Sequence, residues 1–280
     1  MKSQRTAQTR RDPRDVAAAG RPAAPTVIKI GGETSSSVEK LRELAREMPS
    51  LPTGCVLVHG GGAELTALMR RLGMKPVFVD GVRMTAPEEM DAVDNVLSGL
   101  VNKRLVRAFR SAGLNAVGLS GSDGGLFTGR AISPDCRTGE IAAVDVSLVR
   151  LLLREGYLPV ISPVSMDREG TGLNVNADAA AFKLAAALEA SRLVFLSDIP
   201  GILKGGKVIP RLDPAGAERE IAAGTVSGGM IPKLRSSLEA LEDGVDTVLI
   251  GQFAGPGDLQ ALLAGAAGTR VVRMQARRKA

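Results

Sequence analysis

A chain of 280 residues can form one large domain or two small ones, and its 44% hydrophobic content supports a sizeable core. No apolar run approaches the ~20 residues of a membrane span, so no membrane partner is expected. Two cysteines and one histidine argue against a disulfide framework, a histidine-rich metal site and a Ser-His-Asp or Cys-His hydrolase. These features are typical of a soluble protein of a reducing compartment, which we expect to be the cytoplasm.

The net charge of +6 comes from the two ends of the chain. Residues 1–25 hold six basic and two acidic side chains, and residues 270–280 hold five basic and none acidic. The remaining body therefore carries about −3. Basic grooves with interleaved aromatics are also missing, so we expect no nucleic-acid partner.

The first segment, residues 1–25, is rich in Arg and Ala and is interrupted by three prolines. We interpret it as a disordered or weakly helical basic extension. A transit peptide and a short docking helix are the alternatives, although Asp12 and Asp15 argue against a transit peptide. Residues 274–280 form a basic tail.

From Val27 onward, strand-like apolar runs alternate with helical patterns. The predicted strands are Val27–Ile30, Cys55–Val58, Ala116–Leu119, Leu158–Ile161, Leu193–Leu196 and Thr247–Ile250. The predicted helices lie near 38–48, 63–72, 87–112, 145–155, 178–189 and 231–243. This alternation predicts an α/β fold, a three-layer sandwich with a mainly parallel open sheet and helices on both faces. Ligands of such sheets bind beyond the carboxyl ends of the strands.

Residues 126–144 and 202–212 are short strand-like pieces that we interpret as hairpins decorating the main sheet. Residues 201–207 match a P-loop in spacing up to Lys207, but Val208 stands where Ser or Thr is required and a strand follows. We therefore interpret 204–208 as a hairpin turn. The chain after Leu193 is predicted to form a distinct lobe.

Lys29 lies inside the first strand, two residues before the Gly31-Gly32 turn. A lysine in an apolar run costs free energy unless an anion meets it, so Lys29 is either a phosphate ligand or an edge residue with its ammonium in water. His59-Gly60-Gly61-Gly62 follows the second strand and precedes a helix. Three glycines favour an anion cradle over a plain turn. His59 itself is predicted to be packed and hydrogen-bonded.

Three further stretches carry polar residues whose local sequence does not explain them. Arg83 precedes a helix start and either clamps a carboxylate or makes a surface salt bridge. Residues 174–178, Asn-Val-Asn-Ala-Asp, open a helix, and capping explains one of their three polar side chains. Lys233 lies near a helix N-terminus, where a lysine is disfavoured unless an anion is bound, and is a second phosphate candidate.

In this order and spacing, the motifs resemble the amino-acid kinase superfamily and within it the acetylglutamate kinases, from about Val27 to about Val272. The motifs are Lys29-Ile30-Gly31-Gly32, His59-Gly60-Gly61-Gly62, Asp80-Gly81-Val82-Arg83-Met84-Thr85, Asn174-Val175-Asn176-Ala177-Asp178, Leu196-Ser197-Asp198-Ile199-Pro200-Gly201 and Gly229-Met230-Ile231-Pro232-Lys233. The resemblance implies a kinase domain over 26–273, with an acceptor-substrate lobe at about 26–192 and a nucleotide lobe at about 193–273.

The implied reaction is ATP-dependent phosphorylation of the γ-carboxylate of N-acetyl-L-glutamate in arginine biosynthesis. By resemblance, Lys29 and Lys233 neutralise the moving phosphoryl group and Asp178 holds both lysines. The resemblance assigns the remaining site residues as follows: backbone contacts to the phosphoryl group or substrate from Gly31, Gly32, Gly61 and Gly62; substrate binding by Arg83 and Asn174; nucleotide binding by Ser197, Asp198, Ile199, Pro200, Gly201, Ile202, Thr225, Val226 and Ser227.

The resemblance also implies the small-molecule partners and the assembly. ATP binds with Mg²⁺, which is held mainly by nucleotide and water, and no residue is assigned to a metal. At least a homodimer is expected, since the family commonly pairs through the central sheet. One alternative is a kinase for aminoadipate or glutamate on an acidic carrier protein. A second is a non-catalytic nucleotide or amino-acid sensor on the same fold.

Overall fold

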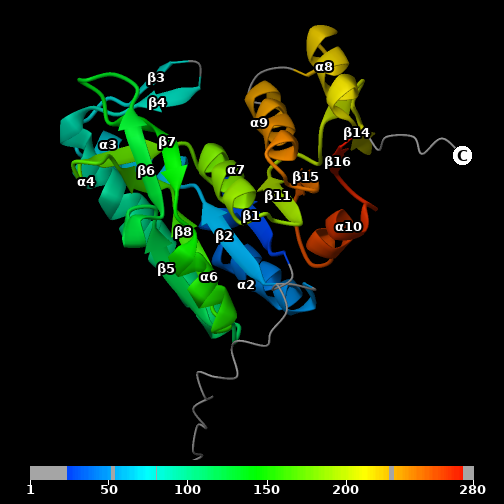
Figure 1. The fold of residues 1–280 in the computed structure, drawn as a ribbon, viewed down its shortest axis with the longest axis horizontal. Coiled ribbons are helices and arrows are strands. Elements are labelled where there is room, and N and C mark those ends of the chain that lie inside the picture. Colours follow the sequence, from blue (N-terminus) through cyan, green and yellow to red (C-terminus); the bar gives the residue numbers. More distant parts are fainter. Residues whose placement is uncertain (1–23, 52–53, 80, 227–229, 274–280) are drawn as a thin grey trace, which may run out of the picture.

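All six predicted strands lie in one eight-stranded sheet of the computed structural model, which describes residues 24–51, 54–79, 81–226 and 230–273. The sheet order is β14-β16-β15-β11-β1-β2-β8-β5 (Figure 1). The six strands from β15 to β5 run parallel, as predicted. They are β1 (Thr26–Ile30), β2 (Cys55–His59), β5 (Ala116–Ser120), β8 (Leu158–Ser162), β11 (Arg192–Ser197) and β15 (Thr247–Gln252).

The other end of the sheet departs from the prediction. β16 (Thr269–Val272) pairs antiparallel with β15, and β14 (Arg211–Leu212) pairs parallel with β16. The prediction that residues 202–212 form a hairpin outside the main sheet is therefore only partly right. β12 (Leu203–Lys204) and β13 (Lys207–Val208) form the expected hairpin, whereas β14 belongs to the main sheet.

Helices cover both faces of the sheet, and the period of two along β1 divides its side chains between them. Val27 is packed in one buried cluster with α7, whereas Ile28 is packed in the other with α2 and α5. The first face carries α6 (Ser147–Arg154), α7 (Ala177–Ala187), α8 (Pro214–Ala222) and α9 (Met230–Glu242); the second carries α2 (Val38–Glu47), α3 (Gly62–Arg71), α5 (Asn102–Ser111) and α10 (Asp258–Ala264). The predicted three-layer architecture is confirmed.

The predicted hairpin at 126–144 is present as β6 (Phe127–Ala131) and β7 (Thr138–Val144), which pair antiparallel. It is more than a decoration, since β9 (Val164–Met166) and β10 (Gly172–Val175) join it in a small closed sheet. The last strand of this sheet leads directly into α7, and thereby places residues 174–178 between the two sheets.

The single helix predicted over 87–112 is wrong in detail. A short 3₁₀ turn at Pro87–Glu89 and α4 (Met90–Val93) lead into a π-helix at Asp94–Val101, and only then does α5 begin. The predicted pattern of apolar residues also missed α1 (Gly32–Ser36), α8 and α10, and the hairpin of β3 (Val77–Val79) with β4 (Val82–Met84). The helices α1 and α10 span only five and seven residues, and strands of three residues cannot establish a period. Length does not explain the miss of α8, which spans nine residues.

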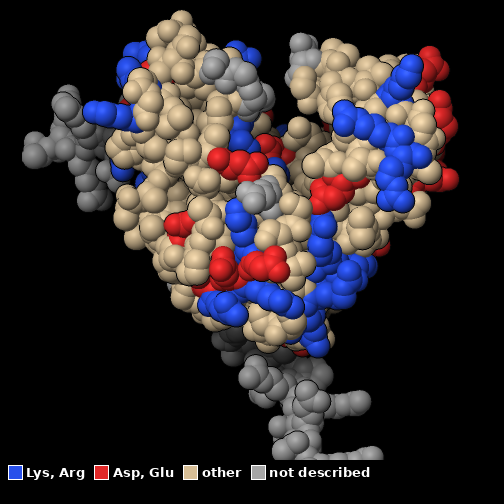
Figure 2. All heavy atoms as spheres, turned by 180° about the vertical axis from the view of Figure 1, so that it is seen from behind, with Lys and Arg blue, Asp and Glu red and all other residues tan. Residues whose placement is uncertain are grey.

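A notch divides the upper part of the molecule between the side that bears β3 and β4 and the side that bears α8 and α9 (Figures 1 and 2). The face of the molecule shown in Figure 2 carries both basic and acidic side chains. In the described residues no helix combines the length and apolar character needed to cross a bilayer. The predicted extension at 1–25 lies outside the described residues except for its last two positions, and the tail at 274–280 lies wholly outside them.

Candidate active site

Lys29 and Lys233 converge on one carboxylate at the carboxyl end of β1. Lys29 points to the same face as Val27, the face covered by α7, because side chains two apart share a side of the strand. Its Nζ lies 2.8 Å from Oδ1 of Asp178, in the first turn of α7. The Nζ of Lys233, in the first turn of α9, lies 2.7 Å from Oδ2 of the same carboxylate.

The charges in this cluster are strongly coupled. Burial raises the pKa of Asp178, but the two lysines outweigh it and lower that pKa to about 2. Burial and the charge of Lys29 lower the pKa of Lys233, against the opposing effect of Asp178. The Lys233 ammonium also lies 4.8 Å from the centre of the Phe195 ring. One carboxylate thus neutralises only half of the positive charge, and the cluster remains a site for an anion.

The glycines after β1 make room for these side chains. A Cβ on Gly31 would lie 2.6 Å from the Lys29 Nζ, and a Cβ on Gly32 would lie 2.0 Å from the Asp198 carboxylate. Gly32 also has a φ of +56°, which favours glycine. The N–H of Gly31 donates to the carbonyl of Leu196 at 3.2 Å. Gly31 therefore contributes space for Lys29, while its amide completes the sheet.

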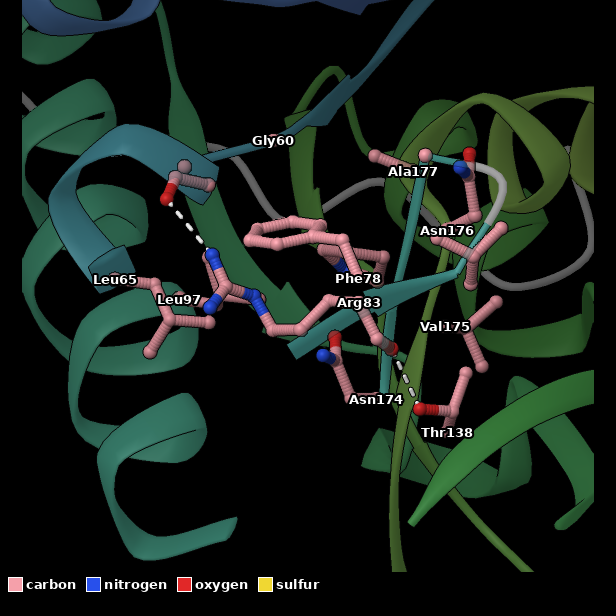
Figure 3. Close-up of a pocket in the computed structure, with 15 residues that line it drawn as sticks. Gly60, Leu65, Phe78, Arg83, Leu97, Thr138, Asn174, Val175, Asn176 and Ala177 are labelled. Atoms are coloured by element: carbon pink, nitrogen blue, oxygen red, sulfur yellow. Dashed lines mark hydrogen bonds between the residues drawn. The ribbon is translucent and has the colours of Figure 1, made fainter. Parts of the chain in front are cut away.

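A second glycine turn, at the end of β2, lies at the wall of a cavity of about 180 Å³. Gly61 precedes α3 with a φ of +153°, and Gly62 is the first residue of that helix. The first amides of a helix have no intrahelical acceptor, so this turn presents N–H groups to an anion. The wall comprises Gly60, Gly61, Gly62, Leu65, Phe78, Gly81, Val82, Arg83, Leu97, Thr138, Pro163, Asn174, Val175, Asn176 and Ala177 (Figure 3).

Arg83 reaches into this cavity from β4, as Figure 3 shows. One guanidinium nitrogen, Nη2, donates to the carbonyl of Gly62 at 3.1 Å and to Oγ1 of Thr66 at 2.6 Å. Phe78 stacks on the guanidinium with 4.7 Å between Cζ and the ring centre, and burial lowers the pKa of Arg83. Thr138 fixes its backbone by donating to the Arg83 carbonyl at 2.6 Å.

The three polar side chains of the motif at 174–178 make different contacts. Asn174 lines the cavity and donates through Nδ2 to Oγ1 of Thr85 at 2.8 Å. Asn176 caps α7 by accepting from the amides of Asp178 and Ala179. Asp178 bridges the lysines. Capping therefore accounts for one of the three, and the motif joins the cavity to the lysine cluster through Ala177.

The residues assigned to the nucleotide follow β11 or precede α9 in the chain. Ser197 ends β11 and donates to the carbonyl of Gly251 at 3.4 Å. Ile202 and Val226 are buried in the core and offer a ligand only backbone atoms. Asp198, Ile199, Pro200, Gly201 and Thr225 lie between these positions along the chain, and Ser227 lies outside the described residues.

The sequence did not single out Phe78, Thr85 or Thr138. An apolar Phe78 that is 52% exposed in a three-residue strand gives no periodic signal. The hydroxyl groups of Thr85 and Thr138 matter only through partners far along the chain, such as Asn174.

Comparison with known proteins places this architecture in a family. A family model described as "Amino acid kinase family" matches residues 24–252. An acetylglutamate kinase of Chloroflexus aurantiacus is 43% identical over 235 residues, which cover 82% of this chain and 92% of the relative. One of Methanopyrus kandleri is 41% identical over 241 residues, covering 82% and 95%.

Among solved structures, N-acetylglutamate synthase from Neisseria gonorrhoeae, complexed with coenzyme A and N-acetyl-glutamate, superposes with a TM-score of 0.78. The identity is 24%, and the match covers 90% of this chain and 60% of that one, so it supports the fold alone. The family model spans most of this sequence, and two relatives exceed 40% identity over nearly their full lengths. The chain therefore belongs to the amino acid kinase family.

Proposed function

We propose that this protein is an acetylglutamate kinase, a cytoplasmic phosphotransferase of arginine biosynthesis. It transfers the γ-phosphoryl group of ATP to the γ-carboxylate of N-acetyl-L-glutamate and releases ADP and an acyl phosphate. The identity of 43% with a relative of that activity supports the substrate. The observation that carries the chemistry is the pair of lysine ammonium groups, 2.8 and 2.7 Å from the two oxygens of Asp178.

The reaction needs positive charge and alignment more than proton transfer. The acceptor carboxylate is ionised at neutral pH, so it can attack the phosphorus without a general base. Lys29 and Lys233 stabilise the charge that spreads over the phosphoryl oxygens in the transition state. Asp178 is a positioning residue, since it holds both ammonium groups in place through its two oxygens.

The cavity beside the lysine cluster suits the acceptor. The guanidinium of Arg83 pairs with the α-carboxylate, and the amide of Asn174 binds the acetamido group. The amides of Gly61 and Gly62 face the transferred phosphoryl group and the acceptor. Leu97 and Val175 supply apolar surface for the acyl chain. ATP lies in the lobe at about 193–273, against Gly32, Ser197–Ile202 and Thr225–Ser227.

Magnesium accompanies ATP, and when bound it neutralises and bridges the phosphates. In the described residues no three His, Cys, Asp or Glu side chains gather as a metal site. Asp178, the carboxylate closest to the lysines, already uses both oxygens on them. The residues present therefore fit an ion that is held mainly by the nucleotide and water.

We also propose that the protein is at least a dimer, joined at β5. This strand is the edge of the main sheet, and an unpaired edge is a template for another chain. Leu100 and Leu151, on elements beside that end of the sheet, are 53% and 45% exposed. Sedimentation velocity should give at least twice the mass of 29.1 kDa. A monomer at micromolar concentration would refute the proposal.

A hydroxamate assay tests the activity, since hydroxylamine traps an acyl phosphate. With ATP and Mg²⁺, we expect product from N-acetylglutamate at least tenfold faster than from N-acetylaminoadipate, glutamate or aspartate. Product from none of them would favour a sensor or a carrier-protein substrate. A preference for N-acetylaminoadipate would indicate a kinase whose acceptor is an aminoadipate derivative.

A further inference from the structure

His59 is the one histidine of the chain, and the proposed reaction does not use it. It ends β2, directly before the three glycines, and its side chain is fully buried. The imidazole lies on the face of the sheet that carries α5, as does Leu57, and not on the face of Lys29. It therefore cannot contact a phosphate that binds to the lysines, and its burial calls for another reason.

The hydrogen bonds of the ring determine its tautomer. Nδ1 lies 2.7 Å from the carbonyl oxygen of Gly60, which can only accept, so Nδ1 carries the proton. Nε2 is then an acceptor, and it lies 3.1 Å from Nδ2 of Asn102, a donor. Both ring nitrogens are satisfied only in this neutral form.

Asn102 is itself held from several sides. Its Nδ2 also lies 2.9 Å from the carbonyl of Val160 in β8 and 3.2 Å from that of Leu119 in β5, so three acceptors share its two N–H groups. Its Oδ1 accepts from the Nζ of Lys103 at 2.9 Å, which confirms the orientation of the amide. The imidazole is thus anchored to two neighbouring strands and to the first residue of α5.

The bond to Gly60 has a consequence for the next residue. The peptide group between Gly60 and Gly61 is planar and trans, so its C=O and N–H point in opposite directions. A carbonyl held toward the buried imidazole turns the N–H of Gly61 toward the cavity. Gly60 and Gly61 have no side chains that would otherwise restrict this peptide plane.

We propose that His59 and Asn102 form a positioning pair, which orients the Gly60–Gly61 peptide so that the Gly61 N–H meets the transferred phosphoryl group. The role rests on the proposed kinase activity. It assigns no proton transfer to the imidazole. A misdirected donor would weaken stabilisation of the transition state more than binding of the ground state, because the phosphoryl oxygens gain their geometry only during transfer.

The electrostatics around the ring agree with a neutral donor. Burial lowers the pKa of His59 to about 4. The bond to Gly60 and the charge of Glu64 oppose that effect, whereas Arg104 and Lys29 add to it. The imidazole is therefore neutral throughout the range in which a biosynthetic enzyme works.

Two substitutions separate the donor from the acceptor. In His59→Asn, Nδ2 takes the place of Nδ1 and can still donate to Gly60. In His59→Gln, the terminal amide takes the place of Nε2, so the bond with Asn102 can remain while the donor to Gly60 is lost. We expect His59→Asn to keep kcat within about threefold and His59→Gln to lose about tenfold or more, with KM for both substrates changed less than threefold. Equal kcat values in two folded variants would overturn the proposal.

The tautomer of His59 can be measured by NMR without substrate or turnover, so this test does not depend on the identity of the substrate. The single histidine gives one set of imidazole signals in a long-range ¹H–¹⁵N spectrum of the full chain. We expect the neutral tautomer with the proton on Nδ1, unchanged from pH 8 to about 5.5. A proton on Nε2, or titration near pH 6.5, would overturn the proposal even in an inactive protein. An active kinase with the wrong tautomer would retain the proposed function and lose only the positioning role.

Discussion

Asp178 is charged in an environment that would otherwise neutralise a carboxylic acid. Its pKa falls from an ordinary 3.8 to about 2 because two ammonium groups outweigh the effect of burial. A folded-state pKa below the unfolded one adds stability that is present above pH 4 and is lost as the pH falls from 3.8 toward 2. The shift corresponds to about 2 kcal/mol.

Asp178→Asn should therefore lower the free energy of unfolding most at neutral pH. We expect a loss of about 2 kcal/mol or more at pH 7, since two lysines lose their anion. The difference from the native protein should shrink steadily below pH 4. Urea unfolding at several pH values between 3 and 7 measures it. A difference that does not change with pH would show that the carboxylate is not stabilised by its lysines.

Lys233→Ala should lower kcat far more than it changes KM for either substrate. The ammonium gains most of its interaction when charge develops on the phosphoryl oxygens, so we expect a loss of about a hundredfold or more. Lys207→Ala is the matched control, because Lys207 belongs to an exposed hairpin that only mimics a P-loop. Its kcat should not change. Full activity of Lys233→Ala would remove the residue from the mechanism.

Arg83→Ala should chiefly raise KM for the amino acid, by about tenfold or more, with KM for ATP unchanged. The guanidinium faces the cavity and keeps donors beyond those bonded to Gly62, Thr66 and the sulfur of Met69. Initial rates with each substrate varied in turn separate the two constants. An unchanged KM for acetylglutamate would show that another group binds the α-carboxylate.

At the scale of single residues, the sequence indicates which charged side chains need a partner better than it indicates the partner. Lys29 and Lys233 stand out locally, because each is costly where it lies without an anion. The contact of both with Asp178 spans 204 positions of the chain, and only the resemblance to a family suggested it. Thr138 carries no local cost, and Thr85 enters only as the last residue of the Asp80–Thr85 motif, so the sequence assigns neither of them a role.

At the scale of elements, the turn after β2 is packed against the π-helix. A Cβ on Gly61 would lie 2.7 Å from Cδ2 of Leu97, whereas a Cβ on Gly62 has no neighbour within 4 Å. The π-helix was not predictable from the apolar pattern. Over eight residues, an α-helix and a π-helix place apolar side chains on the buried face at similar sequence spacings. The strands were predictable, since each is a short apolar run that is followed by a glycine or a polar residue.

Gly61→Ala should destabilise the fold by about 1–3 kcal/mol, because Leu97 must shift and the backbone has a φ of +153°. Gly62→Ala, the matched control for space, should change stability by less than about 0.5 kcal/mol. Thermal and urea unfolding of both variants test this expectation. Equal stability of the two would show that the π-helix does not determine the shape of the turn.

At the scale of the molecule, the proposed acceptor site and the predicted nucleotide site lie on either side of β1. β1 pairs with β2 on one side and with β11 on the other, so the acceptor cavity and the predicted nucleotide segments flank one strand. The alternation of strands and helices predicted the parallel sheet, whereas the resemblance to a family assigned the acceptor and nucleotide segments. The alternation did not predict the reversed strands β14 and β16, since two to four residues carry no information on direction.

The first residues that the structure describes, Ala24 and Pro25, precede β1, and a truncation tests whether the chain from Ala24 onward is sufficient for activity. The carbonyls of Ala24 and Pro25 accept from the hydroxyl of Ser191, and the carbonyl of Pro25 also accepts from its amide, so these two residues hold the start of β1 beside β11. Deletion of residues 1–23 should leave kcat and both KM values within about twofold, and the melting temperature within about 2 °C.

Deletion of residues 1–25 is the matched comparison. It removes the acceptors of Ser191 while it retains every strand and every proposed site residue, so the melting temperature should fall by about 4 °C or more if each lost hydrogen bond contributes about 1 kcal/mol. Calorimetry and the hydroxamate assay on both truncations separate stability from turnover. If the shorter deletion already abolished activity, residues 1–23 would be part of the working enzyme, and the site described here would be incomplete without them.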